Sequence, residues 1–414
     1  MLREGETFQS DSGRRYRVGK QITVGGQAVA YLVTEVTSGE KWVLKAFHER
    51  FNNDDTRTRI RFIMEQDLKR ACPAIEPPVE ILDTGDILGH YTPFVGERAL
   101  EDHLKKPEFT LIDAMQLAIA VVHALVVMNR LGLAYGDIHP GNFRITRSGL
   151  VFEVSVIDLD NYIAAGLPPP PCIGQNLYLA PELRIALEKG SPAIPSVETD
   201  RFALGVLMHE ILLLCHPASG NDHSGEAFNK AMCSGVWLFD PAGGSPPKGL
   251  VGGYPPTVLN AELAGLFRSA FSLDAAKRPS AEVWEAALLR AYSSIFCCPK
   301  RGCLFAIDGS KTTCPQCGYA FPPLSLRIKR GRKAIPLTGG SMVIGRSDLG
   351  GSQMVSARHA VFRRIGPETW IESIGMNGTF CWVDSGWNRI PDGQSVLLES
   401  GDRLRLADVE VQVK

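Results

Sequence analysis

The sequence predicts a multidomain α+β protein made of three successive segments. At roughly 150 residues per domain, 414 residues amount to two or three domains. Hydrophobic residues make up 44% of the chain, enough for buried cores. Five of the ten cysteines lie between Cys297 and Cys317, and short β-like runs separated by glycine-rich turns follow them. We therefore expect a first segment of strands and helices over 1–294, a cysteine-rich segment over 295–323 and a β-sandwich over 324–414.

Composition argues against several classes of protein. The net charge of -1 creates no global field that would favour nucleic acid or a membrane. The stretch MLREGETFQSDSGRRY lacks the apolar region of a secretory signal, and no uninterrupted apolar run approaches ~20 residues. Clustered cysteines in such a chain indicate metal binding rather than disulfides. We expect a cytoplasmic protein that binds neither nucleic acid nor membrane.

The first segment begins with strands and continues with helices. Tyr31–Thr37 and Lys41–Phe47 are strand-like. Leu111–Leu131 and Asp200–Leu214 look helical and are apolar on most faces, as expected inside a large lobe. Asp200 is a candidate N-cap for the second of these helices.

Two upstream motifs suit the binding of phosphate. Gly25 and Gly26 lie between β-prone runs, where a hairpin could bring backbone N–H groups close to an anion. Lys45 ends the apolar strand W-V-L-K, where an inward ammonium needs a partner. Glu65, within the helical stretch Arg57–Arg70, is the candidate partner. A plain hairpin and an exposed strand lysine are the alternatives.

Downstream motifs hold acids at fixed spacings. The stretch Y-G-D-I-H-P-G-N places Asp137 five positions before Asn142, and S-V-I-D-L ends an apolar strand with Asp158. Farther on, L-A-P-E ends at Glu182 and K-R-P contains Arg278. Taken alone, the first stretch could also be an ordinary Pro-Gly turn.

In this order the motifs resemble a eukaryotic-type protein kinase, whose signature comprises a Gly-rich loop, a strand lysine, a helix glutamate, a catalytic Asp and Asn, a metal-binding Asp and A-P-E. The resemblance implies a bilobal fold, with an N-lobe over about 1–95 and a C-lobe over about 96–294. It also implies ATP and Mg²⁺ as cofactors and the transfer of phosphate to Ser or Thr of a protein substrate.

The resemblance assigns a role to each matching residue. Asp137 would accept or orient the proton of the substrate hydroxyl, and Asn142 and Asp158 would hold Mg²⁺. Lys45, fixed by Glu65, would hold the α- and β-phosphates. The remaining nucleotide contacts would come from Val24, Gly25, Gly26, the gatekeeper Thr92, the Pro93 carbonyl and the Val95 N–H.

Structural roles and departures follow from the same resemblance. Glu182 would pair with Arg278, and Asp200 would anchor the catalytic-loop backbone. Tyr135 and Gly136 stand where His-Arg is usual, so no basic side chain beside the catalytic acid awaits a phosphate. Residues 158–182 contain no Ser or Thr, so we expect activity that Ser/Thr phosphorylation of this loop does not control. D-L-D replaces D-F-G, and Thr23 and Ala28 replace two loop glycines.

These departures leave two alternatives open. The chain could be a catalytically weak pseudokinase scaffold. It could also be a small-molecule phosphotransferase, because D-I-H-P-G-N resembles the loop of aminoglycoside kinases, with His139 where protein kinases usually have Lys. L-A-P-E, Asp200 and K-R-P favour the protein kinase.

The cysteine-rich segment has the spacing of a metal site. Cys314 and Cys317 form the knuckle C-P-Q-C-G, and Cys298 and Cys303 would complete a tetrahedral Cys₄ site like that of a zinc ribbon. Cys297 is the alternative to Cys298, which precedes a proline as Cys314 does. So small a segment needs metal to fold, so zinc would be structural. Free thiols in a linker are the other interpretation.

The last segment contains V-I-G-R-S, V-S-A-R-H-A and N-G-T-F in order. They resemble a forkhead-associated (FHA) domain, a β-sandwich whose loops bind phosphothreonine peptides. The family implies that Arg346 and Ser356 bind phosphate oxygens and that Asn377 bonds the peptide backbone. Arg358 would add positive charge, and His359 would shape the loop by packing.

Together the segments imply a kinase joined to a domain that binds the phosphothreonine that the kinase produces. Tethering raises the local concentration of a phosphorylated partner to about the millimolar range. The expected partners are a protein substrate, the chain itself included, and a phosphothreonine protein bound by the FHA domain. The domain order also resembles bacterial kinases associated with a partner phosphatase and a von Willebrand A-type protein.

Overall fold

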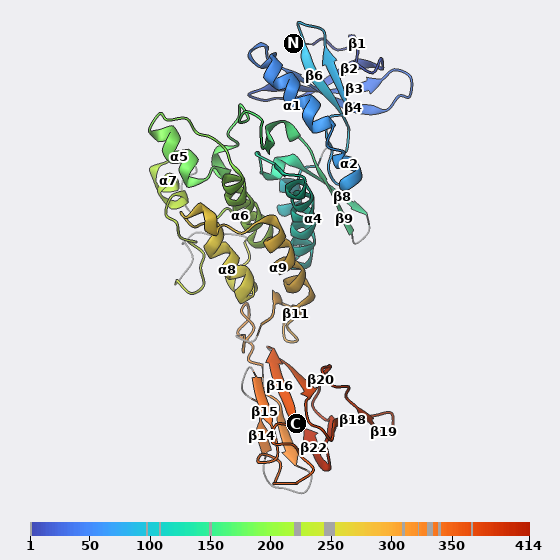
Figure 1. The fold of residues 1–414 in the computed structure, drawn as a ribbon, viewed down its shortest axis with the longest axis vertical. Coiled ribbons are helices and arrows are strands. Elements are labelled where there is room, and N and C mark those ends of the chain that lie inside the picture. The colour runs from blue at the N-terminus through green and yellow to red at the C-terminus, as the bar shows by residue number, and fades with distance from the viewer. Residues whose placement is uncertain are drawn as a thin grey trace. The chain divides into compact units, whose positions relative to one another are not determined.

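The computed structural model divides the chain into two compact units, which we describe separately (Figure 1). The first comprises Met1–Pro256 and Glu262–Tyr292, and the second comprises Thr257–Ala261 and Ser293–Lys414. The cysteine-rich and C-terminal β segments fall within the second unit, and a boundary between them near residue 323 stays a prediction. The structure describes residues 2–96, 98–106, 109–148, 151–218, 225–243, 253–308, 311–321, 323–328, 334–337, 341–365 and 367–414.

The N-terminal lobe of the first unit is a six-stranded antiparallel sheet with strand order β1-β2-β3-β4-β6-β5. Buried side chains alternate along β3 and β4, as expected when one face of a sheet covers a core. Tyr16, Trp42 and Tyr91 lie in that core, and the rings of Tyr16 and Tyr91 stack 4.0 Å apart. The strands are β1 (Thr7–Gln9), β2 (Arg15–Val24), β3 (Ala28–Glu35), β4 (Lys41–Phe47), β5 (Glu80–Asp83) and β6 (Leu88–Pro93).

Two helices take the place of the single helical stretch expected over Arg57–Arg70. The side chain of Asn53 caps the first by accepting a backbone N–H. Asp67 adopts a left-handed φ of 49°, which interrupts the helical path. Ile60 of the first helix belongs to a buried cluster with Ile81 of β5 and Leu88 of β6, and Met64 packs against it. The two helices are α1 (Asp54–Met64) and α2 (Leu68–Ala71).

The C-terminal lobe of this unit is mainly helical. Its helices are α3 (Leu100–Leu104), α4 (Leu111–Arg130), α5 (Pro181–Glu188), α6 (Val197–Leu213), α7 (Glu226–Met232), α8 (Ala261–Ala270) and α9 (Ala281–Ser293). Two antiparallel pairs accompany them, β7 (Leu133–Ala134) with β10 (Ile163–Ala164) and β8 (Phe143–Ser148) with β9 (Val151–Val156).

Local sequence sets the ends of the two long helices. Thr110 and Asp113 form a capping box at the start of α4. Ser196 caps α6, so our assignment of Asp200 as its N-cap is wrong; Asp200 lies inside the first turn. Within the described residues, α4 alone is long and apolar enough to cross a membrane. Most of that helix is buried inside the unit, which accounts for its composition as a core helix.

The second unit contains a short hairpin followed by two β-sheets. The hairpin pairs β11 (Ile295–Cys297) with β12 (Leu304–Ala306). The sheets have strand orders β14-β13-β22-β21-β18-β19 and β15-β16-β17-β20. Side chains of both sheets, among them Leu326, Phe362 and Leu404, share one core cluster, the arrangement of a β-sandwich. The strands are β13 (Ser325–Ile328), β14 (Ala334–Pro336), β15 (Ser341–Ile344), β16 (Ala360–Ile365), β17 (Glu368–Ser373), β18 (Thr379–Val383), β19 (Gly386–Arg389), β20 (Ser395–Leu398), β21 (Arg403–Leu406) and β22 (Val409–Val413).

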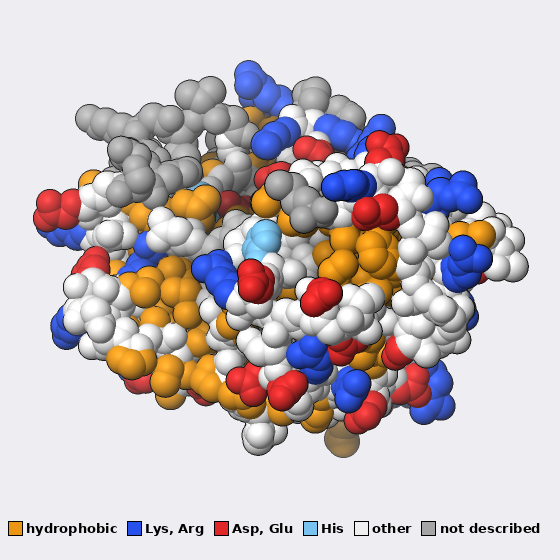
Figure 2. Space-filling view, turned by 90° about the horizontal axis from the view of Figure 1, so that it is seen from above, with side chains coloured by type: hydrophobic (Ala, Val, Ile, Leu, Met, Phe, Trp, Pro, Cys, Tyr) orange, Lys and Arg blue, Asp and Glu red, His pale blue; other side chains and the backbone are white. Residues whose placement is uncertain are grey.

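One face of the molecule carries charged side chains of both signs. The face in Figure 2 carries basic and acidic side chains interspersed among apolar ones. This distribution agrees with the formal net charge of -1.

Candidate functional site

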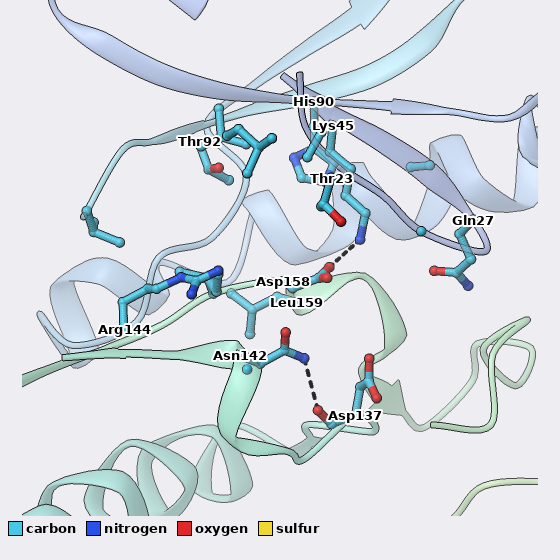
Figure 3. Close-up of a pocket in the computed structure, with 18 of the residues that line it drawn as sticks. Thr23, Gln27, Lys45, His90, Thr92, Asp137, Asn142, Arg144, Asp158 and Leu159 are labelled. Carbon is cyan, nitrogen blue, oxygen red and sulfur yellow. Dashed lines mark hydrogen bonds and ion pairs between the residues drawn. The ribbon is translucent and has the colours of Figure 1, made fainter. Parts of the chain in front are cut away.

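A cavity of about 680 Å³ lies between the two lobes of the first unit (Figure 3). This is a typical size for a site that takes a small molecule or cofactor. Strands β2, β3, β4 and β6 line it from one side, and the segments around β8 and β9 line it from the other. The predicted residues on its wall are Gly25, Gly26, Lys45, Thr92, Pro93, Val95, Asp137, Asn142 and Asp158.

Two predicted residues do not lie in the cavity as expected. Val24 is absent from its lining, and its side chain is 58% exposed. Glu65 is the exposed residue that follows the last residue of α1. The predicted Lys45–Glu65 ion pair is therefore wrong, because the helix ends before Glu65 can face the cavity.

Lys45 pairs instead with two carboxylates of the D-L-D motif. Its ammonium bonds to Asp158, as the dashed line in Figure 3 marks, and lies 2.5 Å from Asp160 Oδ2. Although burial opposes the charged form, the two carboxylates raise the pKa of Lys45 above its usual value. The other oxygen of Asp160 lies 2.8 Å from Nε2 of His90. Burial would raise the pKa of Asp160, but Lys45 and His90 lower it on balance, so this carboxyl stays ionised.

The backbone of the loop that contains Asp137 is held by the side chain of Asp200. The two oxygens of Asp200 accept hydrogen bonds from the backbone N–H groups of Tyr135 at 2.8 Å and Gly136 at 2.9 Å. This confirms the predicted anchoring role. Gly136 has a φ of 81°, and a Cβ there would lie 1.9 Å from the carbonyl oxygen of Asn161. The close approach of that carbonyl explains why no side chain fits where kinases usually have Arg.

Asp137 lines the cavity and has one carboxylate oxygen without a hydrogen-bond partner in the described part of the chain. Among the described residues nothing hydrogen-bonds to its Oδ1, although the atom is buried. Burial and the nearby carboxylate of Asp158 raise the pKa of Asp137 to about 6. Asn142 donates to the Asp137 carbonyl at 3.1 Å, which fixes the turn that joins them (Figure 3). The arrangement suits a base that accepts a proton from an incoming group.

His139 is a neutral neighbour of this base. Burial lowers the pKa of His139 to about 4. Its Nδ1 accepts the Gly141 N–H at 3.2 Å, and its other ring nitrogen is Nε2. That nitrogen lies 3.1 Å from the side-chain amide of Gln175 and 3.9 Å from Asp137 Oδ2. The site thus has a neutral imidazole where protein kinases usually place a lysine.

The segment after Asp158 is tied to the N-terminal lobe. Arg59 of α1 donates to the backbone carbonyls of Asp160, Tyr162 and Pro168, and its guanidinium lies 4.4 Å from the centre of the Tyr162 ring. Gln27, from the hairpin between β2 and β3, donates to the Asn161 side chain at 3.1 Å. These contacts hold the segment without any phosphate group.

A further prediction concerns the helical lobe. Arg278 is almost fully buried and contacts both oxygens of Glu182, at 2.7 and 2.8 Å. This bidentate pair confirms the predicted ion pair. The tyrosines of the loop are also buried: the Tyr162 hydroxyl donates to the Arg59 carbonyl, and the Tyr178 hydroxyl donates to Glu210 at 2.6 Å.

Sequence reasoning missed several residues in and around the cavity. Arg144 follows Asn142 by two positions, and its guanidinium extends into the cavity in Figure 3. Asp160, Arg59 and His90 were missed because each stands where the family pattern has a different residue or none. Among these residues, only Asp160 had a signal in the sequence, as the second acid of D-L-D.

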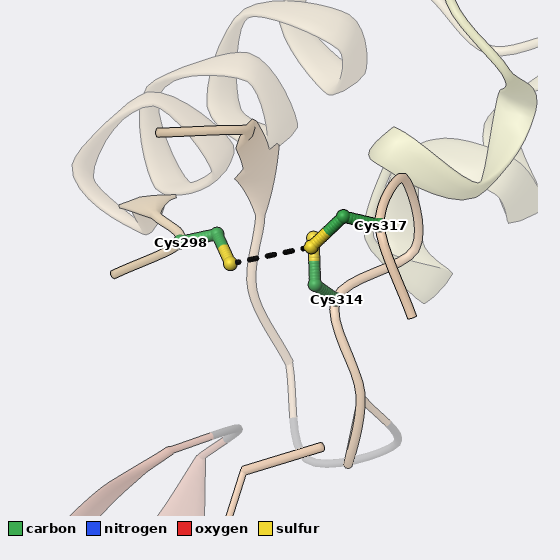
Figure 4. A group of neighbouring side chains, drawn as sticks. All are labelled: Cys298, Cys314 and Cys317. Carbon is green, nitrogen blue, oxygen red and sulfur yellow. Dashed lines mark hydrogen bonds between the residues drawn. The ribbon is translucent and has the colours of Figure 1, made fainter. Parts of the chain in front are cut away.

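The cysteines of the second unit converge. The sulfurs of Cys298, Cys314 and Cys317 lie within 4.8 Å of one another, and those of Cys298 and Cys317 are 3.7 Å apart (Figure 4). The thiol of Cys303 interacts with those of Cys314 and Cys317. Sulfurs 2.3 Å from one tetrahedral ion would be roughly 3.8 Å apart, so the spacing fits zinc. Cys297 is exposed and lies outside this cluster.

The two halves of the cluster are built alike. The Gly302 N–H donates to the Cys298 carbonyl at 2.8 Å, and the Gly318 N–H donates to the Cys314 carbonyl at 2.9 Å. A backbone hydrogen bond from Tyr319 lowers the pKa of Cys317 to about 7. Two turns of the same form therefore present their sulfurs to one point.

Loops of the sandwich bring together the residues predicted for the last segment. The Arg346 N–H donates to the Ser356 carbonyl at 3.0 Å, and the Ser356 hydroxyl oxygen accepts a backbone N–H from the loop before β18. Asn377 donates to the Met354 carbonyl at 2.7 Å. His359 is fully buried and bonds backbone groups of the two loops, as expected of a residue that shapes them.

Arg358 is exposed beside these loops.

The first unit matches a known family. A family model described as the protein kinase domain matches residues 16–288, about two thirds of the chain. The chain therefore belongs to the protein kinase family.

Relatives with similar sequences include several bacterial kinases. A probable serine/threonine-protein kinase of Corynebacterium efficiens is 27% identical over 221 residues, which covers 50% of this chain and 32% of the relative. The probable serine/threonine-protein kinase PknB of Bifidobacterium longum is 26% identical over 231 residues, with 51% and 32% covered. PknA of Corynebacterium glutamicum is 25% identical over 230 residues, with 52% and 46% covered. The matched region spans less than half the length of these relatives.

Proposed function

We propose that the protein is an ATP- and Mg²⁺-dependent kinase that phosphorylates Ser or Thr of a protein partner, itself included. One observation carries the proposal: Lys45, Asp137, Asn142 and Asp158, far apart in sequence, meet in one cavity (Figure 3). The similarity to bacterial serine/threonine-protein kinases supports the choice of hydroxyl substrate.

The donor atoms of the cavity suit the proposed cofactors. Mg²⁺ prefers oxygen ligands, and Asp158 and Asn142 offer a carboxylate and an amide oxygen. Lys45 supplies a cation for phosphate oxygens. Pro93 and Val95 lie on the wall formed by the end of β6, where a carbonyl and an N–H would meet the base.

Asp137 is the proposed base. Its unpaired Oδ1 accepts the proton of the substrate hydroxyl, whose oxygen forms a bond to the γ-phosphorus as the bond to the leaving ADP oxygen breaks. Asn142 holds the Asp137 backbone in place. The products are a phosphorylated side chain and ADP.

Intact-mass analysis after incubation with Mg-ATP tests this function. The parent chain should gain mass in steps of one phosphate, and Asp137→Asn should gain none, because a base that cannot ionise accepts no proton. Dephosphorylated casein serves as an external substrate.

Each alternative has its own outcome in this experiment. A pseudokinase scaffold would transfer nothing to itself or to casein. A small-molecule phosphotransferase would phosphorylate an aminoglycoside probe such as kanamycin and leave protein unmodified. Either result would refute the proposed protein kinase.

We infer a second function for the sandwich, the binding of phosphothreonine peptides by an FHA domain. The proximity of the Arg346, Ser356 and Asn377 loops supports it. Charge-assisted hydrogen bonds are strong, so Arg346→Ala should weaken binding of a phosphothreonine peptide by about tenfold or more. The control variant is Arg327→Ala, which also removes one positive charge, from strand β13. Equal affinity in Arg346→Ala and the parent chain would contradict the assignment.

Further parts of the proposal concern metal, location and partners. The sulfur spacing supports a structural Cys₄ zinc site of Cys298, Cys303, Cys314 and Cys317. Free clustered thiols support a cytoplasmic location. A partner phosphatase and a von Willebrand A-type protein are proposed from domain order alone.

A further inference from the structure

We propose that Asp160 is the positioning residue of Lys45, in the role that the family resemblance gives to a helix glutamate. The inference deepens the proposed kinase function and rests on it for its kinetic part. It assigns the two acids of D-L-D different tasks: Asp158 faces the ligand, and Asp160 holds the lysine.

Exposure separates the two acids. The side chain of Asp158 is 32% exposed and lines the cavity, whereas that of Asp160 is 7% exposed. One oxygen of Asp160 forms an ion pair with the Lys45 ammonium at 2.5 Å that lacks hydrogen-bond geometry, and the other lies 2.8 Å from Nε2 of His90. A carboxylate whose oxygens are both engaged at a buried position is suited to fix the ammonium rather than to take up a ligand.

Helix α1 has no group that could perform this task. Its sequence, D-D-T-R-T-R-I-R-F-I-M, contains no glutamate. The side chain it buries toward the site is a cation, Arg59, which donates to the Asp160 carbonyl at 3.2 Å. A glutamate there would lose these backbone acceptors. The helix thus holds the backbone of the residue that in turn holds Lys45.

This arrangement links two requirements of the site. Asp160 lies two residues after Asp158, on a single 3₁₀ turn, η3 (Leu159–Asn161). The turn that presents the proposed Mg²⁺ ligand therefore also orients the ammonium that meets the phosphates. Movement of α1 alone would not remove the partner of Lys45, whereas movement of η3 would remove it together with the metal ligand.

The test compares three variants of the full chain. Asp160→Asn keeps the size of the side chain and removes its charge. Asp54→Asn makes the same change at a fully exposed acid of α1 and is the matched control. Glu65→Gln tests the partner expected from sequence.

The first measurement needs no nucleotide. The rate at which an amine reagent modifies Lys45 is followed by peptide mass spectrometry at pH 8 to 9. Removing one of two neighbouring carboxylates favours the neutral amine, so Asp160→Asn should react about threefold faster or more. Asp54→Asn and Glu65→Gln should react at the parent rate.

The second measurement separates positioning from binding. In Asp160→Asn, kcat should fall about 10- to 100-fold, because a misplaced group costs this much. The KM for ATP should change less than about threefold, since the lysine remains present to bind phosphate. If the parent chain transfers no phosphate, the kinase proposal fails while the labelling rates still test the role of Asp160.

Two results would overturn the inference. One is an unchanged labelling rate and an unchanged kcat in Asp160→Asn. The other is a large loss of kcat in Glu65→Gln. Should Asp160→Asn fail to fold, Asp160→Gly, which restores the residue usual in D-F-G, must give the same fast labelling and low kcat.

Discussion

At the scale of single residues, the proposed base is unusual in being hard to ionise. Asp137 lies in a buried position beside Asp158, and both effects favour its protonated form. Its pKa of about 6 therefore lies close to neutral pH, where a general base works best.

This pKa predicts the pH dependence of the enzyme. The base must be ionised, so kcat/KM for Mg-ATP should fall as pH drops through about 6, by roughly tenfold per pH unit below it. With saturating Mg-ATP, the fall of kcat at acidic pH should move to lower pH, because a cation bound at Asp158 offsets the negative charge of Asp158. Steady-state rates between pH 5 and 8 provide the measurement.

His139 offers the control for this profile. Its pKa of about 4 is too low to produce a limb near pH 6. His139→Gln should therefore lower or keep the rate without moving the limb. A flat profile between pH 5 and 7 would contradict the assigned base.

Residues also show what the sequence could and could not reveal. Lys45, Asp137, Asn142 and Asp158 were found because each lies in a motif whose chemistry is local. The partner of Lys45 was not found, because the spacing of 20 residues between Lys45 and Glu65 does not show where α1 ends. The structure ends it one residue before Glu65.

At the scale of elements, the segment after Asp158 is held by contacts that need no modification. Arg59 donates to three backbone carbonyls of this segment. The tyrosines of the segment, Tyr162 and Tyr178, are buried and their hydroxyls are hydrogen-bonded. Residues 158–182 contain no Ser or Thr. These contacts support the prediction that Ser/Thr phosphorylation of the loop does not control activity.

The sheets of the second unit were only partly predictable. β15 and β20 coincide with the β-like runs expected at Ser341–Ile344 and Ser395–Leu398. The run expected over Arg403–Lys414 divides into two strands at Ala407, whose φ is 54°. Strands β14, β18 and β19 were missed. Each is three to five residues long and is defined by its neighbours in the sheet rather than by its own pattern.

The cysteine cluster yields a prediction about metal. Purified protein should contain one zinc per chain, and Cys298→Ser should lower that content, because the thiolate is a ligand. Cys297→Ser changes the adjacent, exposed thiol and should keep the zinc. Elemental analysis of both variants measures the difference. If only Cys297→Ser loses zinc, Cys297 is the ligand and the assignment of Cys298 is wrong.

At the scale of the whole molecule, the two units have separate cores. The core cluster of the sandwich contains only residues after Pro323, and the sheet of the first unit has its own cluster around Tyr16 and Tyr91. Cores that are built independently can unfold independently. The proposed ligands also belong to different units, with the nucleotide in the first and zinc in the second.

Calorimetry of the full chain should therefore give two transitions that respond to different ligands. A non-hydrolysable ATP analogue with Mg²⁺, at 100 times its Kd, should stabilise one transition by about 2.7 kcal/mol, because it binds only the folded first unit. Removal of zinc by a chelator should lower the other transition, since metal binding contributes to folding of the small cysteine-rich segment. Lys45→Met, which removes the phosphate-binding cation, should abolish the first shift and leave the second. Two transitions that always move together would mean that the units fold as one cooperative body and that nucleotide and zinc are coupled through it.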